Sequence, residues 1–300
     1  MNIIGKRNIF FAISLLIIVP GFIVLAIWGL PLSIDFTGGS YLEITFESGT
    51  APAPAQVIEL YSQAGYTDVQ VQSTGSDTLL IRSEYLEDDA RQSIINQMET
   101  AFSDKIEIRQ ADSVGPTVGR EVAVRAMGAV AVAALAVVIY IAFAFRGIAH
   151  AFRYGVCAII AMAHDVAVVI SLSAIGGHFL GWQVDSLFLT ALLTVIGFSV
   201  QDKIVVFDRI RENSNIYRKL PFETLVNHSI VQTLQRSINT QLMTVEFMLL
   251  ALALFGGVTL REFAIILLVG LFSGTYSSIF IAASALVVWE NKTSQAKAIV

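Results

Sequence analysis

The sequence predicts a polytopic α-helical membrane protein with six transmembrane helices and a small α+β domain between the first two. Three observations support this fold class. Hydrophobic residues make up 55% of the 300 residues and charged residues only 14%, whereas soluble domains carry about 25% charged residues. Apolar stretches of about 20 residues, enough to cross a bilayer core, recur along the chain. Between 30 and 120 they give way to short alternating segments, which are typical of strands and amphipathic helices.

The first apolar stretch, 9–29, is expected to be an uncleaved membrane anchor. Lys6 and Arg7 precede it, as basic residues precede the core of a signal peptide. Its apolar core is longer than the roughly 7 to 15 residues of such a peptide, and no small-x-small cleavage pattern precedes Pro31. We therefore expect it to remain as transmembrane helix 1.

The block 30–120 is expected to fold as a ferredoxin-like domain with the element order βαββαβ. In this topology an antiparallel sheet carries both helices on one face. The acidic residues near 84–89 are interpreted as a solvated helix N-terminus, where negative charge is favourable, and not as a metal or partner site. The expected elements are strand 41–47, helix 55–64, strands 69–72 and 78–82 around a turn at Gly75, helix 86–102 and strand 105–109.

Five further spans follow, and the positive charges beside them set their orientation. Lysine and arginine gather at alternate span ends, near 6–7, 146–153, 209–219 and 292–297, and such ends are cytoplasmic. Both termini are then cytoplasmic and the block 30–120 is extracytoplasmic. The five spans are placed at 123–145, 153–176, 185–207, 236–257 and 262–289. The domains expected are 1–29 (cytoplasmic N-terminus and helix 1), 30–120 (exported domain), 121–290 (helices 2–6) and 291–300 (cytoplasmic tail).

Two ionisable residues near the cytoplasmic ends of neighbouring spans are the first candidates for a functional site, because charge inside a membrane is costly. Asp202 lies seven residues before Arg209, roughly 10 Å inside the span, and Arg236 opens the next span. A long arginine side chain reaches that depth, so we expect an ion pair that protonation would break. Arg236 as a simple interfacial anchor is the alternative, as is a Lys203 that extends to the interface.

Two deeper carboxylates are candidates for a second step of a proton path. Asp165 and Glu246 lie at similar depths, roughly 18 and 15 Å from the basic residues that mark their span ends. A buried neutral carboxyl group with a hydrogen-bond partner is an equally good interpretation of each. His164, about 100° around the helix from Asp165, is interpreted as structural. Gly270 and Gly274 form a G-x-x-x-G spacing, for which packing between helices of the same chain is expected.

Several function classes are disfavoured by the composition. The block 30–120 has fourteen Asp and Glu against five Lys and Arg, which argues against nucleic acid as a partner. The single cysteine, Cys157, lies in an apolar run, so neither a disulfide framework nor a metal-ligand cluster is expected. No nucleophile and base occur in a usable context, so no catalytic residues and no enzyme activity are expected.

Five motifs, taken together, resemble the SecD/SecF family of protein-export membrane proteins, and among them the SecF subunits, within the resistance-nodulation-division superfamily. They follow one another over nearly the whole chain, which makes the match specific. The chain departs from the family at Gln201 and Lys203, where asparagine and threonine are usual, and at Glu246, where apolar or hydroxyl residues are expected. The motifs are IDFTGG at 34–39, VGP at 114–116, GFSVQDKIVVFDRIREN at 197–213, RSINT at 236–240 and GTYSS at 274–278.

The resemblance implies an accessory subunit of the Sec export machinery in the inner (plasma) membrane of a bacterium. It implies SecD as the partner, the SecYEG translocon and a translocating secretory polypeptide as the targets of action, and YajC and YidC as further associates in the lipid membrane. No cofactor is implied beyond protons as the coupling ion. Asp202 and Arg236 map by motif to the family's functional charges.

Two other functions remain open from the sequence. One is a proton-coupled exporter subunit for small molecules or lipids, although a single module at 41–111 leaves scarcely any room to enclose a ligand. The other is a passive assembly factor, in which the buried charges only hold helices together.

Overall fold

The computed structural model describes residues 2–146, 151–241 and 247–299. The chain consists of two compact units. The membrane unit comprises Met1–Pro31 and Ala129–Val300, and the sheet unit comprises Leu32–Gly128.

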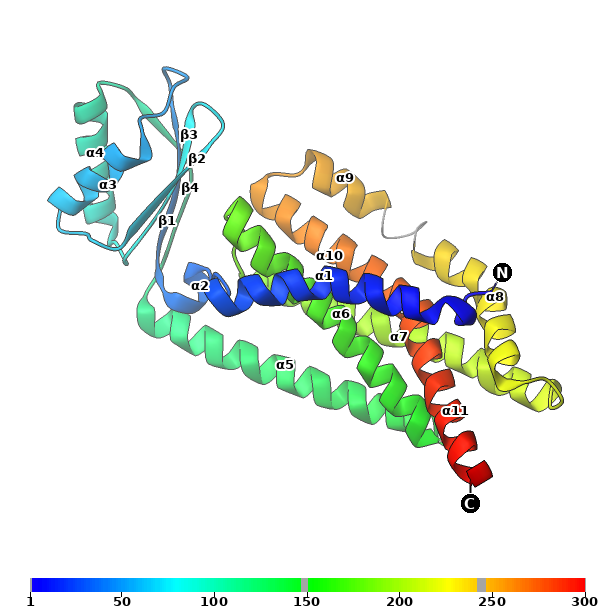
Figure 1. The fold of residues 1–300 in the computed structure, drawn as a ribbon. Helices are drawn as coiled ribbons and strands as arrows, with labels where there is room; N and C mark the ends of the chain where they lie inside the picture. The colour runs from blue at the N-terminus through cyan, green and yellow to red at the C-terminus, as the bar shows by residue number, and fades with distance from the viewer. Residues whose placement is uncertain (1, 147–150, 242–246, 300) are drawn as a thin grey trace. The chain divides into compact units, whose positions relative to one another are not determined.

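The sheet unit is built on four antiparallel strands with the spatial order β2-β3-β1-β4. Two helices, α3 and α4, cover one face of this sheet (Figure 1). The order of strands and helices between 39 and 114 is the one that the alternating pattern predicts. The elements are α2 (Ile34–Thr37), β1 (Gly39–Phe46), α3 (Pro54–Gln63), β2 (Val69–Thr74), β3 (Thr78–Ser83), α4 (Asp88–Phe102) and β4 (Ile106–Val114).

The core of the sheet unit lies between the sheet and these two helices. Alternate residues of the central strand β1, Leu42, Ile44 and Phe46, are buried there, since successive side chains of a strand point to opposite faces. Met98 of α4 and Tyr61 of α3 complete the core from the helical side. Burial also raises the pKa of the Tyr61 hydroxyl above its usual value.

The glycine pair of the IDFTGG motif allows the chain to turn from α2 into β1 against the start of the long helix α5 (Pro116–Ala144). Gly38 and Gly39 have φ angles of 75° and 127°, which side chains rarely tolerate. A Cβ atom on Gly38 would lie 2.6 Å from the Cα of Pro116, and one on Gly119 would lie 2.6 Å from the Gly38 nitrogen. The motifs at 34–39 and 114–116 are therefore two halves of one close backbone contact.

The membrane unit is a set of long helices. Helices α7 and α10 pack closely, as do α1 and α6, and the chain of contacts continues through α6 to α7 and α10. Helix α5 (Pro116–Ala144) belongs to both units, because the boundary falls within it. The other elements are η1 (Ile4–Lys6), α1 (Arg7–Trp28), α6 (Ala151–Leu180), α7 (Ser186–Ile216), α8 (Phe222–Gln241), α9 (Phe247–Phe255), α10 (Val258–Tyr276), the π-helical segment η3 (Ser277–Ala282) and α11 (Ala283–Ile299).

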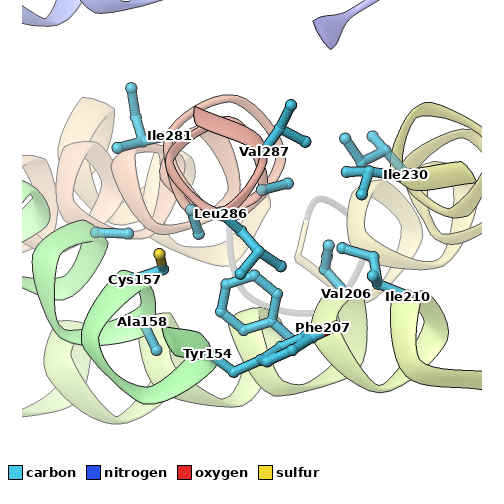
Figure 2. Close-up of a cluster of buried hydrophobic side chains, with 14 of the residues drawn as sticks. Tyr154, Cys157, Ala158, Val206, Phe207, Ile210, Ile230, Ile281, Leu286 and Val287 are labelled. Atoms are coloured by element: carbon cyan, nitrogen blue, oxygen red, sulfur yellow. The ribbon is translucent and has the colours of Figure 1, made fainter. Parts of the chain in front are cut away.

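The apolar core of the membrane unit lies where α6, α7 and α11 meet (Figure 2). Tyr154 and Phe207 make an edge-to-face contact with ring centroids 5.4 Å apart, and Leu286 of α11 lies beside them (Figure 2). Cys157 is buried in the same cluster, as its apolar context predicts.

Five helices of the described chain are long and apolar enough to cross a membrane: Ile4–Trp28, Pro116–Ala144, Ala151–Leu180, Ser186–Ile216 and Leu260–Thr293. They correspond to five of the six spans predicted from the sequence. The remaining one, 236–257, includes residues 242–246, which lie outside the described residues. The helix that carries Arg236, α8, begins earlier, at Phe222, and the expectation that Arg236 opens a span stays a prediction.

Candidate functional site

The buried ionisable side chains of the membrane unit gather around one ion pair. Asp165 on α6 and Lys203 on α7 are both 0% exposed, and the lysine Nζ lies 2.7 Å from Asp165 Oδ2. A buried charge without a partner is strongly destabilising, so each of the two depends on the other. The pair links α6 to α7 inside the unit.

Three serine hydroxyls complete the hydrogen bonding of the Asp165 carboxylate. Ser199 and Ser277 donate to Oδ2 over 2.6 and 2.7 Å, and Ser273 donates to Oδ1 over 2.7 Å. The Lys203 ammonium also donates to the Ser199 hydroxyl and, over 3.2 Å, to the Ser199 carbonyl oxygen. Both carboxylate oxygens thus have several partners, drawn from α7, α10 and η3.

The π-helical segment η3 begins inside this cluster. Ser277, its first residue, contacts Asp165, and the next residue, Ser278, is also 0% exposed. Ser278 donates to the Gly274 carbonyl oxygen over 2.7 Å. Single turns of π-helix occur often at functional sites. Here the segment directs two consecutive hydroxyls into the interior.

His164 connects the cluster to α1. One ring nitrogen, Nδ1, lies 3.1 Å from Asp165 Oδ1, and the other, Nε2, lies 2.9 Å from the hydroxyl of Ser14. The ring also stacks on Tyr276, with centroids 6.1 Å apart. Side chains of adjacent helix residues point about 100° apart, yet the His164 imidazole reaches the Asp165 carboxylate. Through Ser14 it also connects α1 to α6.

Asp202 has a different environment from Asp165. It is 9% exposed, and its Oδ1 accepts a hydrogen bond from the Ser237 hydroxyl of α8 over 2.7 Å. Its Oδ2 is buried without a hydrogen-bond partner among the described residues. Buried polar atoms in native proteins are nearly always satisfied, so an orphaned carboxylate oxygen needs an explanation.

The ion pair expected between Asp202 and Arg236 is not formed. Arg236 is exposed, and no ion pair of Arg236 is found within the three described segments. Its neighbour Ser237 occupies the position opposite Asp202. Adjacent residues of a helix point about 100° apart, and this direction could not be obtained from the depth on which the prediction rested.

The interpretation of Lys203 as a side chain that extends to the interface is also wrong. Its ammonium is fully buried on Asp165. Glu246, the other candidate for a proton path, lies outside the described residues. The structure therefore brings Asp165 and Lys203 together, places Asp202 beside them on α7, and leaves Arg236 at the surface.

The serine partners were missed as functional residues, although the sequence holds a signal for them. Ser199 and Lys203 are four residues apart, and so are Ser273 and Ser277. This spacing places both members on one face of a helix. Each pair forms a polar stripe on an otherwise apolar helix, and a buried carboxylate such as Asp165 needs polar partners of this kind. Together they predict a polar layer shared by the three helices.

The arrangement consists of two buried carboxyl groups that differ in how completely they are hydrogen-bonded. Across residues 2–146, 151–241 and 247–299, no three His, Cys, Asp or Glu side chains gather as metal ligands. The Asp165 carboxylate is held by five donors, one of which is the Lys203 ammonium. The Asp202 carboxylate beside it has one donor, the Ser237 hydroxyl. A proton can change the charge of Asp202 without first displacing a lysine.

Comparison with known proteins gives a consistent result. Residues 94–292 match the family described as "Protein export membrane protein SecD/SecF, C-terminal", and residues 23–50 match the "SecD/SecF GG Motif". The protein translocase subunit SecF of Anaerolinea thermophila is 70% identical, over 97% of this chain and 94% of that protein. The protein translocase subunit SecDF of Thermus thermophilus is 34% identical over 97% of this chain.

A solved structure is similar over the same length. The crystal structure of SecDF from Thermus thermophilus, a translocon-associated membrane protein, matches with a TM-score of 0.83 and covers 97% of this chain. This chain spans 39% of the length of that SecDF chain. On the strength of its two motif regions, its relatives and its fold, the chain belongs to the SecD/SecF family of protein-export membrane proteins.

Proposed function

We propose that this chain has the role for which its relatives are named, the SecF subunit of a protein translocase, and that it couples inward proton flow to protein export. The observation that carries the coupling is Asp202, a buried carboxyl group with one hydroxyl donor and an unsatisfied Oδ2. An oxygen in that state suits a group that takes up and releases a proton.

The switch that we propose is a rotation of α8 about its own axis, opposite Asp202 of the neighbouring helix α7. With the carboxyl group protonated, the neutral Ser237 hydroxyl is a sufficient partner, as observed. With the carboxylate charged, the neighbouring Arg236 is the better partner, and it lies about 100° around the same helix. Proton uptake and loss would then exchange Ser237 and Arg236 opposite Asp202 and shift α8 against α7.

The fixed pair Asp165–Lys203 has a supporting role in this proposal. Its many hydrogen bonds keep α6, α7 and α10 together while α8 moves. Asp165 would therefore be an anchor and not the relay that its depth suggested, and a relay role for Glu246 is left as a proposal from the sequence.

The available energy is adequate for such a step. A membrane potential contributes about 2.3 kcal/mol per elementary charge per 100 mV. Rearranging the contacts of one buried charge involves a few kcal/mol. One proton per cycle can therefore bias one helix movement.

The topology and partners belong to the same proposal. The chain would cross the membrane six times with both termini in the cytoplasm, and the sheet unit would be a ferredoxin-like domain outside it. SecD would be the obligate partner, as the fused SecDF relatives suggest, and SecYEG with its secretory polypeptide the target. YajC and YidC would associate with the pair in the lipid bilayer.

The test replaces Asp202→Asn, which keeps the shape and removes the charge. Export of a secretory protein into inverted membrane vesicles, measured with and without a proton gradient, should lose its dependence on the gradient. Asp208→Asn is the matched control, because Asp208 lies on the same helix in an exposed ion pair with Arg211. Gradient-dependent export by the Asp202→Asn chain would overturn the proposal.

A further inference from the structure

The two edges of the four-stranded sheet are protected to different degrees. The outer edge of β4 carries exposed charged side chains at Glu107, Arg109 and Asp112, and its pairing with β1 is broken by a bulge. Such features discourage another strand from pairing. The other edge strand, β2, has the sequence VQVQST, with no charge, no proline and an unbroken register with β3.

The main-chain groups that β2 leaves open can be assigned from the register. Phe46 N donates to Asp77 O over 2.9 Å, so alternate residues of β3 starting at Asp77 face β1 and those between them face β2. The β3 residues that face β2 pair with Gln70, Gln72 and Thr74, whose main-chain N–H and C=O groups therefore point toward β3. Val69, Val71 and Ser73 therefore point their N–H and C=O groups away from the sheet, where no described strand pairs with them.

We propose that the outer edge of β2 binds an extended segment of the translocating polypeptide as an added strand. The proposal rests on the proposed function, which supplies an unfolded chain. Strand addition uses main-chain hydrogen bonds and so depends little on sequence. A translocase needs this property because its substrates differ in sequence. With only three outward-facing residues, the binding is weak and quickly reversed.

The charges around β2 indicate which segments bind best. Asp68 precedes the strand, and the Glu84 carboxylate accepts from Asp68 N over 3.4 Å at the same end. Asp77 lies at the other end, in the turn between β2 and β3. An acidic residue stands at each end of an uncharged edge. Neutral and basic segments are therefore favoured over acidic ones.

The first experiment follows amide hydrogen exchange in the full chain, reconstituted in lipid nanodiscs. The probe is a short unstructured peptide of alternating threonine and valine with a lysine at each end. In the free protein the Val71 and Ser73 amides should exchange fast and the Gln70 and Gln72 amides slowly. The peptide should slow the outward pair about tenfold, and a version with glutamate in place of lysine should do so less.

Two results would overturn the proposal. One is exchange at Val71 and Ser73 that the peptide leaves unchanged. The other is protection of these amides before any peptide is added, either at all protein concentrations, as with an edge covered by the chain itself, or rising with concentration, as with a second copy.

A pair of variants tests the edge directly. Ser73→Pro removes one outward N–H and leaves the β2–β3 ladder intact, and it should weaken peptide binding about tenfold. Ser73→Ala keeps the N–H and should bind as the unmodified chain does. Equal binding by both variants, with equal thermal unfolding, contradicts strand addition.

The outcome can be separated from the proposed function. Peptide binding needs no proton gradient, so the Asp202→Asn chain should bind the peptide normally. If Asp202→Asn loses gradient-dependent export while the peptide fails to protect β2, strand addition is wrong and proton coupling stands.

Discussion

Two carboxylates on neighbouring helices of the membrane unit differ in how completely their oxygens are bonded. Asp165 has a lysine, three serines and a histidine around it, whereas Asp202 has one serine. Burial alone would make both costly. This difference in hydrogen bonding is the reason why the proposed function gives Asp165 a structural role and Asp202 the proton.

Replacement of Lys203 tests this division of roles. Lys203→Met leaves the Asp165 charge buried without its cation, so the free energy of unfolding should fall by about 3–5 kcal/mol. Chemical denaturation of the purified chain in detergent micelles, followed by circular dichroism, measures the change.

The control is a double variant. Asp165→Asn with Lys203→Met removes both charges together and should recover most of the lost stability, because a buried pair is worth little more than an uncharged replacement. A Lys203→Met chain as stable as the unmodified one would show that Asp165 does not depend on the lysine.

These side chains show which features of the site can be predicted from the sequence and which cannot. The depth of Asp202, Asp165 and Arg236 follows from a fixed rise per residue, and charges in apolar spans are conspicuous. Which neighbour a side chain meets depends on the rotation and approach of another helix, and no single segment contains that information. This is why Arg236 was expected where Ser237 lies.

Helix α10 shows how small residues set the separation between elements. A Cβ atom on Gly270 would lie 2.2 Å from Val195 Cγ2 of α7 and 3.1 Å from Val169 Cγ2 of α6, whereas one on Gly274 would be in ordinary contact, 3.4 Å from Ser199. The G-x-x-x-G spacing thus serves contacts within the chain, as expected. Only its first glycine is tightly enclosed.

Alanine substitutions at the two glycines should therefore differ in their effect on stability. Gly270→Ala should destabilise the chain by about 1–3 kcal/mol, because α7 and α10 must separate or Val195 must move. Gly274→Ala should be neutral within about 0.5 kcal/mol. Thermal unfolding of both variants in the same detergent checks the contrast, and equal effects would show that α10 does not pack as closely on α7 as described.

At the scale of the whole molecule, we expect this chain to function together with a SecD-type partner chain. Its SecDF relative of known structure is one longer chain, of which this one spans 39%. We predict that the tagged chain, isolated from its own membranes in mild detergent, carries a SecD-type chain in equal amount. Quantitative mass spectrometry measures the ratio, and a homo-oligomer without such a chain would contradict the prediction.

The order of helices and strands could be predicted over most of the chain, because hydrophobic period and length are local properties. Five spans and the sequence of elements in the sheet unit followed from them. The start of the helix that carries Arg236 could not be predicted in this way. Helix α8 is polar along most of its length, so hydropathy gave no sign that it begins at Phe222, well before Arg236.

The Lys203 ammonium has one further consequence for how the chain responds to its surroundings. A dissolved counter-ion leaves a carboxylate when its concentration falls, but this one is covalently attached and fully enclosed. Its occupancy of the Asp165 site is set during folding and does not follow the ionic composition of the medium. Sodium or potassium in the medium should then affect this ion pair only through the general screening of surface charge.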